Sequence, residues 1–232
     1  MLCSLINNYK EEAIRANENL LAVVRKKRDL KWEAIALASR FWVHGKQEGG
    51  ETIDGQSYLI GARVTSPLAI EMQLMIGVRA RIRGDLPAAR RYLEESLQYV
   101  PMYRSKPHET MTRSELGHIY RQAGDYSVAK EMYRQTIRAW SDLGHRAAVA
   151  NQVECFAFIA RAAGDAQRAV RLLGAAEALR EDVDSIMTDY ERPEYEHEVG
   201  ELRKQVEEQA FANLWAEGRL LPLEKAIELA VG

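Results

Sequence analysis

The densest group of side chains that could do chemistry stands near the C-terminus, where one histidine lies among four carboxylates: Glu194, Glu196, His197, Glu198 and Glu201. Ligands on a helix must be three or four residues apart to share a metal, and His197 has that spacing to Glu194 and Glu201. A second histidine is missing, so a charged, solvated helix face is the preferred interpretation. The other histidines are scattered, and none stands beside a serine or cysteine with an orienting acid. The residues predict no metal, no cofactor and no catalytic site.

A second candidate is a column of arginines that repeats every 40 residues: Arg81, Arg121 and Arg161. Each begins an Arg-x-x-Gly-Asp motif, and a guanidinium group can hold a carboxylate or phosphate through two parallel hydrogen bonds. The alternative is that each arginine pairs with the aspartate four residues on, across the turn. Pairs of that kind are common, so this alternative is preferred, although both interpretations can hold together.

The repeated motif also predicts the elements that position these arginines. Its glycine stands where a helix must stop and the chain reverse, and its aspartate can cap the following helix. Five residues after each glycine stands a small residue, Ala89, Ala129 or Ala169. A second small slot holds Gly77, Gly117 and Ala157, as two closely approaching helices require. The spacing predicts helix pairs over 68–83 and 86–99, 109–123 and 126–141, and 146–163 and 166–182, with Pro101 and Pro107 in the link between the first two pairs.

The flanking segments are less regular. Residues 5–28 and 29–44 are predicted helices, and the first ends in the basic run Arg25 to Arg28, interpreted as a solvated helix end. Gly45 to Gly50 lacks the Gly-Lys-Ser/Thr ending and the preceding strand of a phosphate-binding loop. It therefore predicts an enlarged loop before a helix over 51–64, with phosphate binding as the weaker alternative. The predicted organisation is an irregular part at 1–67, three regular repeats at 68–183, and capping helices at 184–232.

The second unit resembles the tetratricopeptide repeat through Leu116-Gly117, Tyr120, Gly124, Tyr126, Ala129 and Tyr133. It departs from that family in its period of 40 residues instead of about 34, and in lacking the signature tryptophan and the closing proline. The resemblance implies an all-α, right-handed α-solenoid whose first helices line a concave groove. It implies groove-facing side chains, which we place at Arg81, Ser114, His118, Arg121, Gln122, Asn151, Glu154, Phe158 and Arg161.

The C-terminal segments resemble the end of large bacterial ATPase-type transcriptional regulators and related cyclases. The resemblance rests on Leu172 to Arg180, Tyr190 to Glu196, Ala210 to Arg219 and Leu223 to Ala230. It implies the helical sensor end of such a protein, without its ATPase or DNA-binding parts. Phe211 and Trp215, four residues apart, are interpreted as packing of this C-terminal cap, with a partner-binding pair as the alternative.

Composition narrows the class of partner. The net charge of −2 and the pI near 6.3 indicate no direct binding to nucleic acid or membrane. Two distant cysteines and the absence of a signal peptide or a long apolar run favour a cytoplasmic location. We therefore expect a non-catalytic module that binds a protein or peptide in the groove, with a homo-oligomer through the N-terminal end also expected. The alternative is a small-molecule effector sensor with a pocket between helices.

Overall fold

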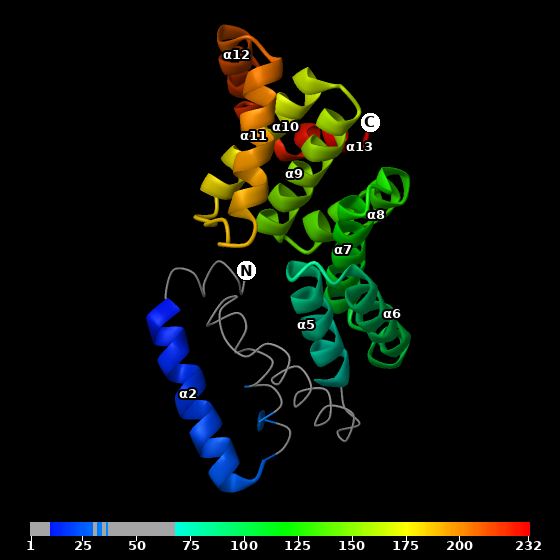
Figure 1. The fold of residues 1–232 in the computed structure, drawn as a ribbon, viewed down its shortest axis with the longest axis vertical. Coiled ribbons are helices and arrows are strands. Elements are labelled where there is room, and N and C mark those ends of the chain that lie inside the picture. Colours follow the sequence, from blue (N-terminus) through cyan, green and yellow to red (C-terminus); the bar gives the residue numbers. More distant parts are fainter. Residues whose placement is uncertain (1–9, 30–31, 34–35, 37–67) are drawn as a thin grey trace. The chain divides into compact units, whose positions relative to one another are not determined.

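Figure 1 shows the computed structural model, which describes residues 10–29, 32–33, 36 and 68–232. Every regular element in these ranges is a helix, which confirms the all-helical class. The chain divides into two compact units, one reaching Ile119 and the other Tyr120–Gly232, and each is described by itself. Several predicted features lie outside the described residues: the glycine-rich stretch at 45–55, the helix at 51–64 and most of the helix at 29–44. Most of the N-terminal end, through which a homo-oligomer is predicted, also lies outside them.

The first unit contains α2 (Lys10–Lys27), α5 (Leu68–Ile82), α6 (Leu86–Tyr103) and most of α7 (Lys106–Gln122). Helices α5 and α6 form a hairpin in which Gly77 faces Leu93. A Cβ added at Gly77 would lie 2.7 Å from the Leu93 Cγ, so this slot admits no larger side chain without rearrangement. The basic end of α2 is exposed, and its Arg25 pairs with Glu33 at 2.9 Å.

Helix α6 is longer than the sequence predicts. It continues through Pro101 to Tyr103 and ends at Arg104, whose φ of 49° is left-handed and whose N–H donates to the Val100 carbonyl at 2.8 Å. A proline so near the end of a helix removes only one N–H bond, and the helix continues past it. Pro107 is the second residue of α7, where no intrahelical N–H bond is needed. The placement of both prolines in a link between helices is therefore wrong.

The three Gly-Asp turns have the predicted geometry. Their glycines adopt φ of 85°, 82° and 83°, and each following aspartate accepts the N–H three residues on at 3.1, 3.3 and 3.1 Å, for Asp85, Asp125 and Asp165 in turn. A turn of the same form joins α8 (Tyr126–Asp142) to α9 (Arg146–Ala162), with Gly144 at φ 72°. There His145 takes the place of the aspartate and makes no side-chain capping bond.

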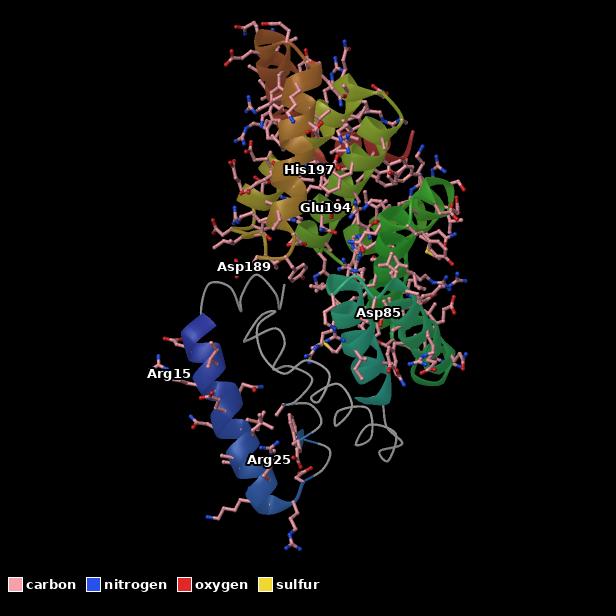
Figure 2. All side chains as sticks on the ribbon, in the orientation of Figure 1. Arg15, Arg25, Asp85, Asp189, Glu194 and His197 are labelled. Atoms are coloured by element: carbon pink, nitrogen blue, oxygen red, sulfur yellow. The ribbon has the colours of Figure 1, made fainter. Side chains whose placement is uncertain are left out.

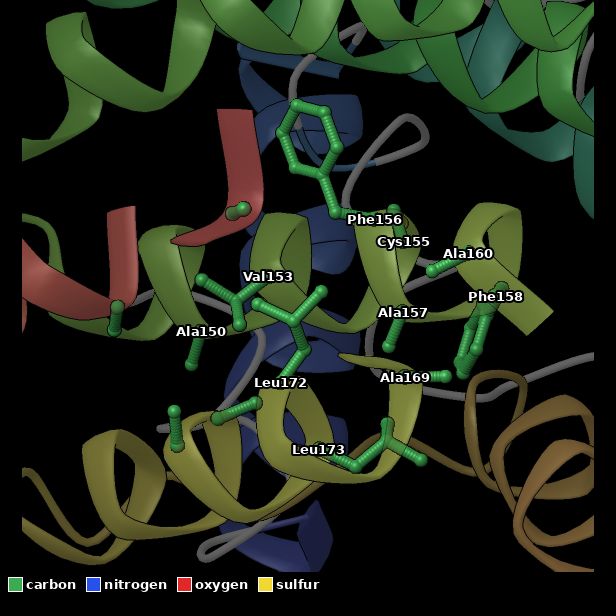
Figure 3. Close-up of a cluster of buried hydrophobic side chains, with 14 of the residues drawn as sticks. Ala150, Val153, Cys155, Phe156, Ala157, Phe158, Ala160, Ala169, Leu172 and Leu173 are labelled. Atoms are coloured by element: carbon green, nitrogen blue, oxygen red, sulfur yellow. The ribbon is translucent and has the colours of Figure 1, made fainter. Parts of the chain in front are cut away.

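Helix α9 is the centre of the second unit. It packs against α8 on one side and α10 (Ala166–Glu181) on another, and every residue from 152 to 160 is buried. Figure 3 shows Val153 and Ala157 of α9 facing Leu172 and Leu173 of α10. Ala129, Ala157 and Ala169 have no exposed surface, so all three are part of the packed core of this unit.

Three helices follow α10: α11 (Arg192–Gln205), α12 (Glu208–Arg219) and α13 (Leu223–Val231). Helix α12 packs along α10 with Gly174 and Gly218 at the crossing, each against the backbone of the other helix. Phe211 is buried in the core of this unit and stacks on the half-buried Trp215, whose indole donates to Glu177 at 2.7 Å. The packing interpretation of this aromatic pair is therefore confirmed.

Helix α13 is held by arginines from two other helices. Arg168 of α10 donates to the carbonyls of Leu229 and Ala230, and Arg134 of α8 donates to that of Val231 at 3.2 Å. Positive charge at a helix C-terminus suits both its free carbonyls and its dipole. Within the described ranges, no helix is long and apolar enough to cross a membrane.

Candidate functional site

The candidate site is the face of α9 that the sequence predicts to hold a partner. In the structure a helix of the same chain, α11, lies on this face, as Figure 1 shows with α11 in orange beside α9. Three side chains of α11 and the turn before it, Glu191, Glu194 and Glu198, contact predicted groove residues. Glu194 and Glu198 are four residues apart, which places them on the same side of α11.

Arg121, in the last turn of α7, binds Glu194 with both terminal nitrogens, at 2.6 and 2.8 Å. Its guanidinium also stands over the Phe158 ring, 5.2 Å from the ring centre. The Arg121 side chain is only 7% exposed, whereas that of Glu194 is 38% exposed. The Arg121 guanidinium is thus fixed in a nearly buried position, and the Glu194 carboxylate reaches it from the partly exposed helix α11.

Arg161, at the end of α9, makes the second contact. Its Nη2 donates to Glu198 Oε1 at 2.7 Å and its Nε donates to the other oxygen of the same carboxylate. The Glu198 side chain is 10% exposed, and its hydrogen bonds raise the pKa of Arg161. Farther along α9, the Asn151 amide donates to Glu191 at 2.9 Å. Two bidentate ion pairs therefore connect α11 to this face, and one hydrogen bond from the Asn151 amide holds the residue just before α11.

The preferred interpretation of the motif arginines, pairing with their own aspartates, is wrong. Arg81, in the first unit, instead binds Glu115 of α7 at 2.7 Å, and the other two bind α11. The physical reason lies in the turn, because each aspartate directs its carboxylate toward the backbone N–H groups of the next helix. The arginine one turn back reaches across to a neighbouring helix instead.

Glu154 is placed on α9 as predicted but is bound inside the unit. Arg180 of α10 donates to both of its oxygens, at 2.6 and 2.8 Å, and the carboxylate is 3% exposed. Burial raises the pKa of Glu154, and the Arg180 guanidinium opposes that rise. A charge reversal at Glu154 would leave Arg180 buried beside a like charge, so this position tests folding and not recognition.

The remaining predicted groove residues divide by unit. Ser114 and His118 are buried in the first unit, where the Ser114 hydroxyl donates to the Thr110 carbonyl at 2.8 Å. Gln122, at the end of α7, is exposed and belongs to the second unit with Arg121. The structure thus brings Arg121, Asn151, Phe158 and Arg161 together on one unit, where α11 covers them.

Sequence reasoning missed the role of the acidic residues on α11. It weighed Glu194 and Glu201 as ligands of a metal beside His197, yet in the structure Glu194 binds Arg121, Glu201 binds Lys204, and His197 is exposed; Figure 2 labels Glu194 and His197. The sequence holds two glutamates one helical turn apart, Glu194 and Glu198, and two arginines 40 residues apart, Arg121 and Arg161, but nothing in it joins the two pairs. Only the folded chain shows that the two pairs meet.

Comparison with known proteins supports the class that the turns and helix pairs define. Residues 110–141 match the family model described as tetratricopeptide repeat, over α7 and α8. The chain therefore carries a tetratricopeptide repeat, which confirms the predicted resemblance.

Three relatives carry the name "Putative HTH-type transcriptional regulator", two from strains of Mycobacterium tuberculosis and one from Mycobacterium bovis. Each is 24% identical over 158 residues, which is 68% of this chain and 18% of the relative. The similarity thus spans less than a fifth of the relatives' length. No solved structure matches the chain significantly.

Proposed function

We propose that the chain is a non-catalytic, protein-binding sensor or scaffold module of a bacterial transcription-regulatory protein, working in the cytoplasm. The observation that carries this proposal is the tetratricopeptide match over 110–141, in a chain whose helix pairs repeat the same capped Gly-Asp turn. Stacked helix pairs of this kind present extended surfaces for other proteins. The similarity to the mycobacterial regulators supports a regulatory setting.

The proposed architecture is a right-handed solenoid with the helices after residue 184 as its cap. Phe211, Leu214 and Leu202 are buried against the last helix pair, as a cap requires. The proposed working surface is the concave side lined by the first helices, with Arg121, Asn151, Phe158 and Arg161 as its members in the second unit. Two arginines that each offer a planar, bidentate donor pair suit a partner that brings carboxylates.

The proposal is tested by capturing partners from the source cells on the immobilised chain and identifying them by mass spectrometry. The variant carries Arg121→Gln and Arg161→Gln, and the matched control carries Arg138→Gln, which alters an exposed arginine on the other helix of the same repeat. We expect partners that the control retains to be lost from the double variant. If every partner survives the double substitution, the assignment of this binding face is wrong.

The second candidate, an effector sensor, draws on a cavity of about 290 Å³ in the first unit. Its described lining contains two apolar side chains and four charged ones, from the end of α6 and the start of α7: Leu97, Val100, Arg104, Lys106, Glu109 and Arg113. Burial acts to raise the pKa of Glu109, but its pairs with Arg113 and Lys106 outweigh this effect and lower the pKa. A small-molecule site is expected to have a mainly apolar lining, and this lining is mostly charged. The effector-sensor function is therefore less well supported than the binding of a protein partner.

A further inference from the structure

Helix α11 is attached to the second unit mainly through charged and polar groups. Of its 14 residues only Glu198 and Leu202 are buried, and one of these is a carboxylate. Tyr195 and Val199 are half-buried and add a modest apolar contact. Each of the two ion pairs joins a nearly buried group to a more solvated one, so the cost of desolvation offsets much of the attraction and the net free energy is small compared with apolar burial. The geometry therefore describes a helix held in place by specific contacts but with a small apolar anchor.

The neighbouring helix α12 is attached in a different way. Phe211, Leu214 and Gly218 are buried, and its backbone meets that of α10 at the glycine crossing. Between α11 and α12 stand only Val206, in extended conformation, and Glu207, which caps α12. Residues 182–191 connect α11 to α10 on the other side and contain no long helix. Helix α11 thus has fewer buried residues than α12 and a non-helical connection on each side.

The pairing geometry specifies what could replace α11. Glu194 and Glu198 are one helical turn apart, and each offers both carboxylate oxygens to one arginine. A helix from another protein with two acidic side chains four residues apart presents the same pair of carboxylates. An extended chain spaces residues four apart by about 13 Å instead of about 6 Å, so it does not reproduce this arrangement.

We propose that α11 is an internal ligand of the α9 face, and that the partner is an acidic helical segment that takes its place. This inference rests on the proposed function and adds the partner's chemistry and its competition with α11. Because α11 is tethered, it acts at an effective concentration in the millimolar range, and a partner must compete with it. The apparent dissociation constant of the partner therefore depends on the fraction of molecules in which α11 is released.

The test uses the full chain and a fluorescent peptide with the sequence of residues 188–206, followed by anisotropy. The chain with Glu194→Gln and Glu198→Gln keeps Arg121 and Arg161 but weakens their internal ligand. We expect this chain to bind the peptide at least about tenfold more tightly than the unmodified chain. The same peptide carrying glutamine at both positions is the matched control, and we expect it to bind neither chain. A chain with Arg121→Gln and Arg161→Gln is expected to lose the unmodified peptide.

Hydrogen exchange separates release from unfolding. In the Glu194→Gln, Glu198→Gln chain we expect the amides of α11 to lose protection while those of α12 keep it. If α12 loses protection as well, the single variant Glu194→Gln, which alters the more exposed of the two carboxylates, replaces the double one.

If the peptide binds the unmodified chain and the glutamine variant with equal affinity, the displacement of α11 by a partner is refuted. Absence of binding to both chains would refute it as well. Either result leaves the proposed function standing, because partner capture tests that proposal separately. Binding that survives the loss of the peptide's two carboxylates would overturn the acidic helix as the partner.

Discussion

Gly218→Ala is the sharpest test of the packing between α10 and α12. A Cβ at position 218 would overlap the Arg171 carbonyl oxygen and lie 2.8 Å from its carbonyl carbon and 3.0 Å from its Cα. Ordinary contact begins near 3.4 Å, so even the carbon atom must retreat by roughly 0.6 Å. The obstacle is helix backbone, which cannot rotate away as a side chain can.

The expected magnitude combines two terms of opposite sign. Overpacking of a well-packed site costs about 1–3 kcal/mol, and a backbone obstacle places this substitution near the upper value. Replacing glycine by alanine inside a helix returns about 1 kcal/mol through helix propensity. We therefore expect Gly218→Ala to lower the free energy of unfolding by about 2 kcal/mol, which for a chain of this size is a fall in Tm of about 4–8 °C.

The matched control is Gly200→Ala on α11, where an added Cβ meets nothing within 4 Å. This substitution keeps the propensity gain without the overlap, so we expect it to raise the free energy of unfolding by about 0.4–1 kcal/mol. Both variants are compared with the unmodified chain by thermal and urea unfolding, followed by circular dichroism. If Gly218→Ala is as stable as Gly200→Ala, the close crossing of α10 and α12 is refuted.

Three further predictions concern single side chains. Asp125→Ala removes a helix cap and should lower the free energy of unfolding in urea by about 1 kcal/mol. His145→Asp supplies the cap missing at the fourth turn and should raise that free energy by about 0.5 kcal/mol. If both substitutions change stability in the same direction, the capping argument is contradicted. Burial raises the pKa of Cys155 to about 11, so in a Cys3→Ser chain we expect a thiol reagent at pH 8 to react only after unfolding, and fast reaction of the native chain would refute the burial. Glu207 accepts hydrogen bonds from two backbone N–H groups, which lower its pKa. Its contribution to the free energy of unfolding is therefore present at pH 7 and is lost as pH falls through the lowered pKa. The difference in stability between the unmodified chain and Glu207→Gln should vanish in acid, and a difference that does not change with pH would refute the role of this carboxylate.

The sequence predicts the helix pairs well because their signals are local. A glycine with positive φ and the capping aspartate after it act within six residues, and the alanines at 89, 129 and 169 are fully buried as the pattern predicts. Pro101 was misplaced because a proline in the last turn of a helix removes only one bond, which the pattern cannot distinguish from a true end. The turns and caps, which depend on neighbouring residues, were therefore predicted, and the helix ends were predicted to within a few residues.

The contacts of the candidate site were not predictable in the same way. Arg121 and Glu194 are 73 residues apart and Arg161 and Glu198 are 37 apart, and no periodic pattern joins them. The arginines were placed on the right helices, but their partners lie on a segment outside the 40-residue period. Surface charge leaves such pairing open, because a glutamate on an exposed helix face can equally well face water.

The long separations within these ion pairs also bear on the order in which the chain folds. The hairpins close through turns of a few residues, so their contacts need little loop entropy and form early. The arginines that bind α11 take their positions from the packing of α9, α10 and the end of α7 around Phe158. We expect α11 to dock last, so that the binding face exists for a short time before its own chain covers it. Pulse-labelled hydrogen exchange would record this as late protection of 192–205, and a partner present during folding would meet the face while it is open.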